Sequence, residues 1–564
     1  MKTTPRLVTN ERVLVAVMAL TVMYVSWRYA TMVAGGSDSF GYISQADSWV
    51  RGSVEIPQPW IRQVPWPHAG RSFSPLGYTP SQDQRGIVPT YPPGLPLLMA
   101  GAARLGGYCA MFWVVPISAA LMVVGTYVLG RRLDGGRTGT IAAALVASSP
   151  VFLYMFVHPM TDVPVASAWT MSFVLLLPPS PTPRSARSVG GLAPGARLAT
   201  RSFGGRAFGA GLVASLAVLI RPNLAPAVVV PLAWFALKAW RDAPAERVRY
   251  VRRGLLFIAG LLPGAVFLAL FNSRMYGSPW RSGYGDISSL FSFSHFLPNL
   301  VSYTRWFAEK HAWLPLLGFY ALVAPGRWPW RTSADLVTVR VMGLFVLVVW
   351  LEYCLYSVFD AWWYLRFLLP CWPFIMIGFA AAASRVAERS RAAAAIVAIA
   401  IVALGVRGVW DSVKENSFVI WGSERDYVKI AELVRSITGE NSVILASQHS
   451  GSLRYYGGRV TINYGSFNAE WLDRGLDWLE NRGVHPYVLL DDYEVAAFKG
   501  KFRDQQRVAL LDALPVLTYQ TAGLTSLYDL SRLPRTHPTL AIRAFPHKGS
   551  HCTPPAAPPR LVLQ

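Results

Sequence analysis

The sequence predicts a mainly α-helical protein: a polytopic membrane helix bundle of about 11 transmembrane helices, followed by a C-terminal extracytoplasmic α/β domain. Of the 564 residues, 53% are hydrophobic and 15% are charged, whereas ordinary soluble domains carry about 25% charged residues. Long uncharged runs such as Leu105 to Gly130 account for the difference, and they are long enough to cross a hydrocarbon core about 30 Å thick. After about residue 410, segments typical of strands alternate with segments typical of helices.

Each membrane helix is expected where an apolar run reaches a sufficient length. The expected spans are 13–34, 108–130, 138–157, 161–179, 207–220, 223–237, 254–273, 312–325, 341–359, 364–384 and 392–410. The first span lacks a small-residue cleavage site and is interpreted as a retained anchor. The run from Tyr91 to Ala100 is apolar but rich in proline, so we expect an interfacial or re-entrant segment there.

The distribution of basic residues predicts the orientation. The formal net charge is +22, which in a soluble protein would suggest a nucleic-acid partner. Here the Lys and Arg residues concentrate in loops between apolar spans, which indicates membrane orientation instead, with no nucleic acid. These loops lie at 2–12, 131–137, 184–206, 238–253 and 385–391. They all fall on one side if the N-terminus is cytoplasmic.

This orientation divides the chain into a membrane region (1–410) with a large first outer loop (35–107), an extracytoplasmic α/β domain (411–533) and a proline-rich tail (534–564) that we expect to be disordered. Within the α/β domain, helices are predicted over 423–437 and 470–482, and strands over 442–446 and 487–490. The four cysteines have no spacing typical of a zinc site or a disulfide framework.

Asp38 is the first candidate for chemistry. It follows a Gly-Gly-Ser turn directly after the first span and begins an amphipathic segment, which is typical of a helix at the membrane interface. The alternative is that Ser37 or Asp38 caps this helix. Tyr42 and Asp47 in the same segment, and Tyr91 later in loop one, are expected to contact substrate.

Three further charged residues enter apolar spans. Asp162 lies at the outer end of a predicted helical hairpin, where an acid is costly unless it faces a cavity or a partner; helix capping is the alternative. Arg366 lies just inside an aromatic belt, and its planar guanidinium suits a phosphate; snorkelling or a pair with Asp360 is the alternative. Glu352 is expected deep in a span, with no assigned role.

Other motifs exclude whole classes of function. The sequence has no P-loop, no GxGxxG after a strand, no HExxH and no CxxC, which argues against a nucleotide-driven pump or a cytoplasmic nucleotide-sugar enzyme. His449 follows a predicted strand, but no GxSxG pattern surrounds it, and we interpret this segment as a surface loop.

Four features in order give the chain a resemblance to a known superfamily. They are Asp38 after the first helix, Pro92-Pro93 late in loop one, Asp162 at the outer end of the next helical hairpin, and the Tyr364-Leu365-Arg366-Phe367 entry to a late helix. This arrangement resembles the GT-C glycosyltransferases of the protein O-mannosyltransferase and aminoarabinose-transferase type, over roughly residues 1–410. Two features depart from those branches: Asp38 is followed by Ser39 rather than Glu, and Thr90-Tyr91-Pro92-Pro93 lacks an acid and a lysine.

The resemblance implies a membrane glycosyltransferase in a bacterial plasma membrane, with a polyprenyl-phosphate-linked sugar as donor. It implies Asp38 as the general base for an acceptor hydroxyl, and Asp162 as a second catalytic residue. Arg366, together with Arg221 or His158, would bind the donor phosphate, and Tyr364 would contact substrate. The acceptor is a lipid, a glycan or a protein. No cofactor is assigned, and a divalent cation at Asp162 stays open.

Two other classes of function remain as alternatives. A transporter or flippase of lipid-linked sugars would use the same cavity without a catalytic base, and inverted repeats would favour it; we see no repeat in the sequence. A structural factor that binds a partner through its α/β domain would not need the acids of loop one.

Overall fold

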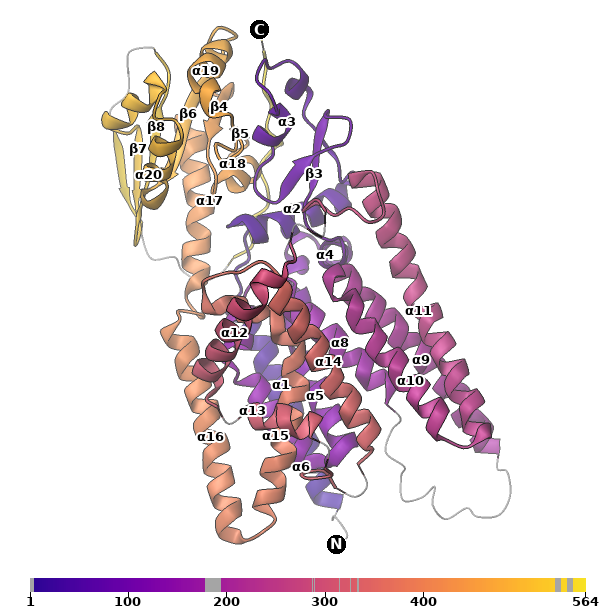
Figure 1. Ribbon diagram of the computed structural model, residues 1–564. Coiled ribbons are helices and arrows are strands. Elements are labelled where there is room, and N and C mark those ends of the chain that lie inside the picture. Colours follow the sequence, from indigo (N-terminus) through magenta and orange to yellow (C-terminus); the bar gives the residue numbers. More distant parts are fainter. Residues whose placement is uncertain are drawn as a thin grey trace. The chain divides into compact units, whose positions relative to one another are not determined.

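The computed structural model describes all of the chain except residues 1–4, 178–193, 287, 289, 314, 325, 332, 333, 533–538, 545–550 and 564. The chain forms two compact units and passes between them several times. The colours in Figure 1 follow the sequence from the N-terminus to the C-terminus. Unit 1 contains residues 1–28, 113–270 and 286–418, and unit 2 contains residues 29–112, 271–285 and 419–564.

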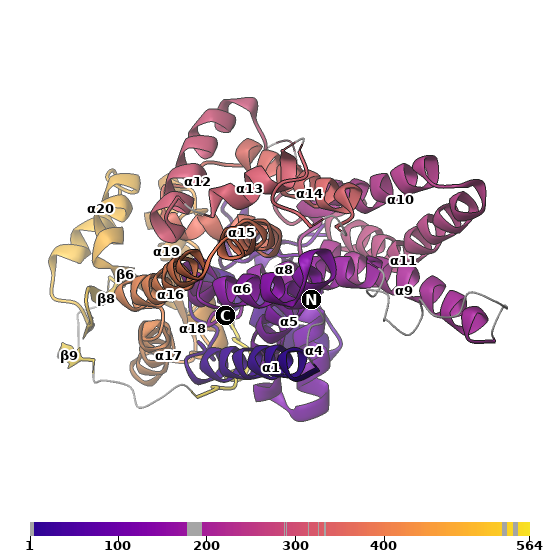
Figure 2. The same cartoon turned by 90° about the horizontal axis from the view of Figure 1, so that it is seen from below.

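Unit 1 is a bundle of helices. Its helices are α1 (Pro5–Arg28), α5 (Val114–Asp134), α6 (Gly136–Ala147), α7 (Pro150–Met155), α8 (Asp162–Leu176), α9 (Pro194–Ile220), η4 (Pro222–Val228), α10 (Val229–Arg241), most of α11 (Pro244–Tyr276), η6 (Phe293–His295), α12 (Phe296–His311), α13 (Leu316–Val323), α14 (Leu336–Leu355), η7 (Trp362–Cys371), α15 (Trp372–Ala387) and α16 (Arg391–Lys414). Figure 2 shows α1, α6, α15 and α16 from below, and each packs against the next in this series.

The helices of unit 1 differ sharply in which side chains they bury. In α15, Trp372, Phe374 and Ile375 are fully buried. By contrast, α16 exposes Ile396 and Ile399 to the outside of the unit. A helix whose exposed residues are aliphatic is suited to lipid rather than water. The protein is a multi-pass membrane protein.

The described residues contain six helices that are long and apolar enough to span a membrane, and two shorter apolar helices, Asp162–Leu176 and Gly205–Ile220. The expected span at 138–157 instead forms the two short helices α6 and α7, because Pro150 starts a new helix with Ser149 as its N-cap. The first helix ends at Arg28, six residues before the expected end of its span (34 − 28 = 6).

The two ends of the unit 1 bundle carry different chemistry. One end holds the last turn of α5, the start of α14 and the end of α15. There Asp134 accepts hydrogen bonds from the Arg331 backbone N–H (2.9 Å) and from Arg385 (3.4 Å). Several loops rich in Lys and Arg therefore meet at this end, while the candidate site described below is built at the other end.

Unit 2 contains two sheets and the helices around them. The part of unit 2 that comes first in the sequence consists of α2 (Ser37–Arg51), β1 (Ile56–Pro57), η1 (Pro59–Arg62), α3 (Ala69–Ser72), β2 (Tyr78–Pro80), β3 (Gly86–Pro89), α4 (Gly94–Gly106) and η2 (Tyr108–Trp113). Its three strands pair in the order β1-β3-β2 and are antiparallel. The proline-rich segment of loop one continues into α4, whose 13 residues are too few to cross a bilayer.

The C-terminal part of unit 2 is an α/β domain. Its elements are α17 (Ile420–Ile437), β4 (Ser442–Leu445), α18 (Ser450–Tyr455), β5 (Val460–Ile462), η8 (Ala469–Trp471), α19 (Leu472–Glu480), β6 (His485–Asp491), α20 (Asp492–Lys501), η9 (Gln506–Asp512), β7 (Leu517–Gln520), β8 (Leu524–Asp529) and β9 (Leu540–Arg543). The sheet order is β5-β4-β6-β8-β7-β9. Strand β4 is parallel to both β5 and β6, whereas β8 is antiparallel to β6 and β7.

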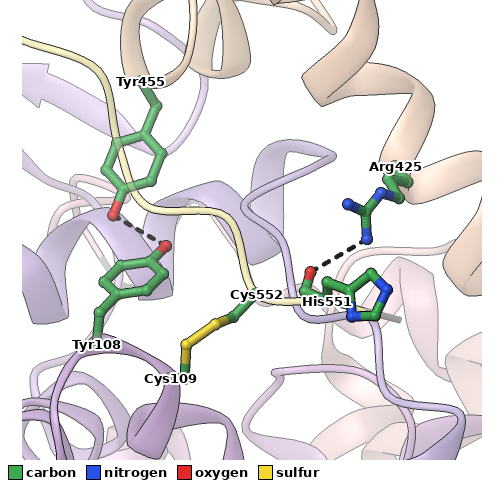
Figure 3. Close-up of a disulfide and its surroundings, with 6 residues drawn as sticks. All are labelled: Tyr108, Cys109, Arg425, Tyr455, His551 and Cys552. Atoms are coloured by element: carbon green, nitrogen blue, oxygen red, sulfur yellow. Dashed lines mark hydrogen bonds between the residues drawn. A yellow bond between two sulfur atoms is a disulfide. The ribbon is translucent and has the colours of Figure 1, made fainter. Parts of the chain in front are cut away.

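Within the proline-rich tail, whose composition predicts disorder, some of the described residues make specific contacts. Residues Leu540–Arg543 form β9 beside β7, and Cys552 forms a disulfide with Cys109, with 5.6 Å between the Cα atoms (Figure 3). Beside it, Arg425 donates a hydrogen bond to the His551 carbonyl (3.3 Å). The cysteine spacing did not indicate this disulfide, because a pair separated by 443 residues leaves no local pattern.

Candidate functional site

A buried carboxylate lies at the centre of a polar cluster in unit 1. Asp162 is the first residue of α8 and is only 1% exposed. The N-cap of that helix is Thr161, whose side chain makes no capping hydrogen bond. The Asp162 carboxylate instead forms an ion pair with Arg221. The main interaction of Asp162 is therefore this ion pair and not a helix cap.

The position of Arg221 follows from the proline after it. Helix α9 ends at Ile220, and Arg221 is extended, with φ −140° and ψ 90°, as expected for a residue before proline. Pro222 then begins η4. This break directs the Arg221 side chain back across the helix end to Asp162, and its guanidinium lies 5.3 Å from the centre of the Phe367 ring.

Arg366 approaches the same carboxylate from another element. It lies in η7, and its Nε atom is 3.9 Å from Asp162 Oδ1. Its Nη1 donates to the Met160 sulfur (3.0 Å), and its guanidinium lies 5.4 Å from the centre of the Phe367 ring. Two guanidinium groups thus share one carboxylate and one aromatic ring. Asp162 and the two arginines together carry a net positive charge and present planar N–H donors, which is the chemistry that binds an oxyanion.

Two neutral residues that the sequence did not indicate extend this cluster. The Tyr353 hydroxyl accepts hydrogen bonds from Asn223 (2.9 Å) and Arg221 (3.4 Å), and Asn223 also donates to Glu352 (3.0 Å). Glu352 was expected deep inside a span, but α14 ends at Leu355, so Glu352 lies in the last turn. The break at Pro222 was the available signal for Asn223, since it places the following residues at a helix end.

His158 and Tyr364 lie at the edges of the cluster. The Nδ1 atom of His158 is 2.8 Å from the Tyr154 carbonyl oxygen, and the two rings pack at 4.9 Å. The Tyr364 ring lies 5.3 Å from the Arg366 guanidinium and stacks on Phe359 at 4.0 Å. Four of the residues that the sequence nominated in unit 1 are linked by contacts: Asp162, Arg221, Arg366 and Tyr364.

Asp38 lies in unit 2, in the first turn of α2. The N-cap of this helix is Gly36, without a side-chain cap, so neither Ser37 nor Asp38 is the cap. The Tyr91 hydroxyl donates a hydrogen bond of 2.6 Å to Asp38. Burial, followed by the charge of Asp38, raises the pKa of Tyr91 well above its ordinary value, so this hydroxyl stays protonated and keeps donating.

Aromatic rings fix the position of Tyr91. Its ring packs against that of Tyr42 at 4.6 Å and meets Tyr284 edge-on at 6.0 Å. A Cβ atom at Gly41 would lie 2.2 Å from the Tyr91 ring, so the glycine is what allows the ring to lie against α2. Asp38, Tyr42 and Tyr91, which the sequence nominated separately, therefore form one group.

Glu424 is a further acidic neighbour that the sequence did not indicate. It is part of α17, and its carboxylate accepts a hydrogen bond from the Gly36 N–H (3.2 Å). Burial, and then the negative charge of Asp38, raises the pKa of Glu424 to about 6. No local pattern in the sequence links residues 36 and 424, because the contact is made by tertiary packing within unit 2.

Asp47 is not brought to Asp38. Nine residues separate the two along one helix (47 − 38 = 9), and at about 100° per residue they face opposite sides. Asp47 pairs with Arg51 at 2.7 Å and lines a separate cavity of about 440 Å³.

A divalent cation does not fit the residues around Asp162. Two guanidinium groups already approach this carboxylate, and they would repel a metal ion. Among the described residues, no group of three or more His, Cys, Asp or Glu is placed to hold a metal. We therefore derive no step that uses a metal.

This protein is similar to known proteins in its fold and not in its sequence. No family model matches the sequence, and no curated protein matches it. The structure is similar to that of ArnT from Cupriavidus metallidurans bound to undecaprenyl phosphate, with a TM-score of 0.52 and 14% identity over 93% of this chain and 98% of that chain. It is also similar to the oligosaccharyltransferase of Archaeoglobus fulgidus tethered with an acceptor peptide, with a TM-score of 0.53 and 12% identity over 92% of this chain and 74% of that chain. Both are membrane glycosyltransferases of the GT-C superfamily, and the present chain has the GT-C fold.

Proposed function

We propose that the protein is a membrane glycosyltransferase that moves a sugar from a polyprenyl-phosphate-linked donor to a hydroxyl-bearing lipid, glycan or protein acceptor outside a bacterial plasma membrane. The observation that carries this proposal is the pair of arginines that share Asp162. A net positive, largely buried cluster at the ends of membrane helices suits a lipid phosphate whose tail stays in the bilayer. The likeness to a structure bound to undecaprenyl phosphate supports the same substrate class.

In this proposal the arginines bind the donor and stabilise its leaving group. Arg366 and Arg221 donate hydrogen bonds to the phosphate oxygens, where negative charge develops as the bond to the sugar breaks. Asp162 holds the two guanidinium groups in place before substrate arrives, which lowers the cost of ordering them. His158 and Tyr364 border the site from the neighbouring turns.

Asp38 is the proposed general base. It takes a proton from the acceptor hydroxyl, the hydroxyl oxygen attacks the anomeric carbon, and the bond between that carbon and the phosphate oxygen breaks. The lipid phosphate leaves with the electron pair, and the configuration at the anomeric carbon inverts. The Tyr91 hydrogen bond orients the Asp38 carboxylate, and Tyr42 packs behind it. The proposal requires Asp38 and the arginines to face one cavity.

Two observations support an extracytoplasmic position for unit 2. Its disulfide between Cys109 and Cys552 is typical of an oxidising compartment. The Lys- and Arg-rich loops of unit 1 are typical of the cytoplasmic side, which leaves the cluster around Asp162 at the outer side. The N-terminus would then be cytoplasmic.

The test is turnover by purified protein in detergent, where no second compartment exists for transport. Polyprenyl-phosphate sugars with a radiolabelled sugar are incubated with a cell-envelope extract as acceptor source, and the release of label from the lipid is measured. We expect consumption of donor by the wild type and its loss in Asp38→Asn. Asp83→Asn, which changes an exposed carboxylate of loop one with no proposed role, is the control and should keep turnover. Full turnover by Asp38→Asn would refute the base, and intact donor in every reaction would favour a transporter.

A further inference from the structure

The sheet of the α/β domain has a point where its strand order reverses. The chain forms β4 first, then adds β5 on one side of it and β6 on the other. The parallel register aligns Leu445 of β4 with Val488 of β6. In open α/β sheets the connections on either side of such a point lead away from each other, and ligands bind in the crevice at the carboxyl ends of the two strands.

Two polar side chains meet at this point. His449 follows β4 and Asp491 ends β6, and His449 Nε2 lies 3.2 Å from Asp491 Oδ1. Asp491 also accepts hydrogen bonds from the hydroxyls of Thr525 (2.6 Å) and Tyr493 (3.1 Å). Burial alone would raise the pKa of Asp491, but these hydrogen bonds, with that of His449 the largest, lower it below its ordinary value. Asp491 is therefore a carboxylate that holds the Nε2–H of His449.

The other nitrogen of this imidazole is the unexplained group. His449 is 4% exposed, and its Nδ1 has no hydrogen-bond partner among the residues that the structure describes. With the proton on Nε2, Nδ1 is an acceptor. A buried acceptor without a partner destabilises the folded protein, and a ligand that donates a hydrogen bond to Nδ1 would remove this cost.

A cavity of about 310 Å³ opens beside this pair. Its volume is at the lower end of the range for ligand pockets, about 300–1,000 Å³, and suits a single sugar ring. Tyr427, whose ring packs on His449 at 4.5 Å, and Tyr493 form aromatic walls. Asp426 and Asp492 add carboxylates, and no Lys or Arg is among the described residues that line it. A phosphate or another anion would therefore be repelled.

We propose that this cavity binds a sugar unit through its hydroxyl groups, or through an amine where the sugar has one. The carboxylates and His449 Nδ1 accept hydrogen bonds, and the tyrosine rings pack against the C–H face of the sugar. The residues that line this cavity include neither Asp162 nor Asp38, and the proposal does not depend on the proposed transferase activity.

The same strand offers a matched control. His485 at the beginning of β6 pairs with Asp529 at 2.9 Å, so it has the same chemistry as the pair of His449 with Asp491. It lies at the amino end of the strand, and its side chain is 34% exposed. A variant of His485 therefore changes a His–Asp pair of the domain without touching the proposed sugar site.

The experiment is saturation-transfer difference NMR on the full-length protein in a detergent without a sugar headgroup. The probes are glucose, galactose, mannose, arabinose, N-acetylglucosamine and glucosamine, each titrated alone. We expect saturable binding of at least one sugar to the wild type. His449→Ala and Tyr493→Ala should each weaken it about tenfold or more, whereas His485→Ala should leave it unchanged. Tyr493 is 65% exposed, so its variant keeps the test valid if His449→Ala does not fold.

Asp38→Asn separates this proposal from the transferase proposal, because it should abolish turnover and leave sugar binding intact. Stronger binding of glucosamine than of glucose would show that the carboxylates recognise the amine, and equal binding would show recognition of hydroxyls. The proposal is overturned if no sugar of the panel gives a saturable signal, or if the signal is the same in His449→Ala and Tyr493→Ala as in the wild type.

Discussion

Replacement of Asp162 by Asn should destabilise the protein far more than its small change in volume suggests. Asp162 is 1% exposed, and Arg366 Nε lies 3.9 Å from it. At that distance and an effective dielectric constant of about 20, the attraction between the two charges is about 4 kcal/mol. Arg221 is closer still. Asp162→Asn leaves two buried guanidinium groups facing each other without a counter-charge, and removal of one partner of a buried pair costs about 3–5 kcal/mol.

A double-mutant cycle isolates this effect. Arg221→Gln removes one of the two positive charges, so Asp162→Asn with Arg221→Gln should be less destabilised than the sum of the single variants, by about 1–3 kcal/mol. The free energy of unfolding is measured by titration of mixed micelles with a denaturing detergent. Asp411→Asn is the control, because Asp411 pairs with the half-exposed Arg407 at 3.6 Å and such a surface pair contributes about 0–1 kcal/mol.

The reasoning is refuted if Asp162→Asn costs no more than the control, or if the effects of the two substitutions add to within about 0.5 kcal/mol. Either result would mean that the three side chains are not a coupled, buried cluster. In that case Asp162 would not hold the two arginines in place for a phosphate.

Three further predictions concern unit 2. Tyr91→Phe removes the hydrogen bond of 2.6 Å to Asp38, so turnover should fall about 10- to 100-fold in initial-rate measurements; an unchanged rate would show that Tyr91 does not position the base. Because the folded protein raises the pKa of Glu424 from 4.5 to about 6, the stabilisation that its protonated form provides is full below about pH 4.5 and is lost as the pH rises through about 6. Unfolding titrations across this range should show the loss in wild type and not in Glu424→Gln, and identical curves would contradict it. Cys552→Ser should lower the free energy of unfolding by about 2–4 kcal/mol, reductant should lower that of the wild type equally, and insensitivity of the wild type to reductant would exclude the disulfide with Cys109 in solution.

The fold was predictable where the sequence pattern is local. Apolar runs indicated the membrane helices, and helical periodicity indicated α17, which the structure places at Ile420–Ile437. Strands β4 and β6 were expected from their buried apolar residues, whereas β5, with three residues, was too short to give a pattern. The split of 138–157 into α6 and α7 was missed because hydrophobicity is continuous there, although Pro150 was a visible signal.

The candidate site was predictable residue by residue but not as an arrangement. Asp162 was nominated because an acid at the start of an apolar helix needs a partner or a cavity. Arg366 was nominated because its guanidinium suits a phosphate, and Arg221 was nominated through the resemblance as a second group for that phosphate. Their meeting depends on packing between elements 59 residues apart or more, which no local pattern records. His449 was set aside as a loop residue. The rule that parallel strands align their carboxyl ends would have placed it beside Asp491, had the parallel pairing of β4 and β6 been known.

The most direct test of the central claim is an experimental structure of the protein with undecaprenyl phosphate. We predict that the phosphate oxygens lie within hydrogen-bonding distance of the Arg221 or Arg366 guanidinium, with the Asp38 carboxylate facing the same cavity across the space that the sugar would occupy. A phosphate bound elsewhere, or an Asp38 carboxylate too distant for a sugar to bridge it to the phosphate, would contradict the proposed mechanism.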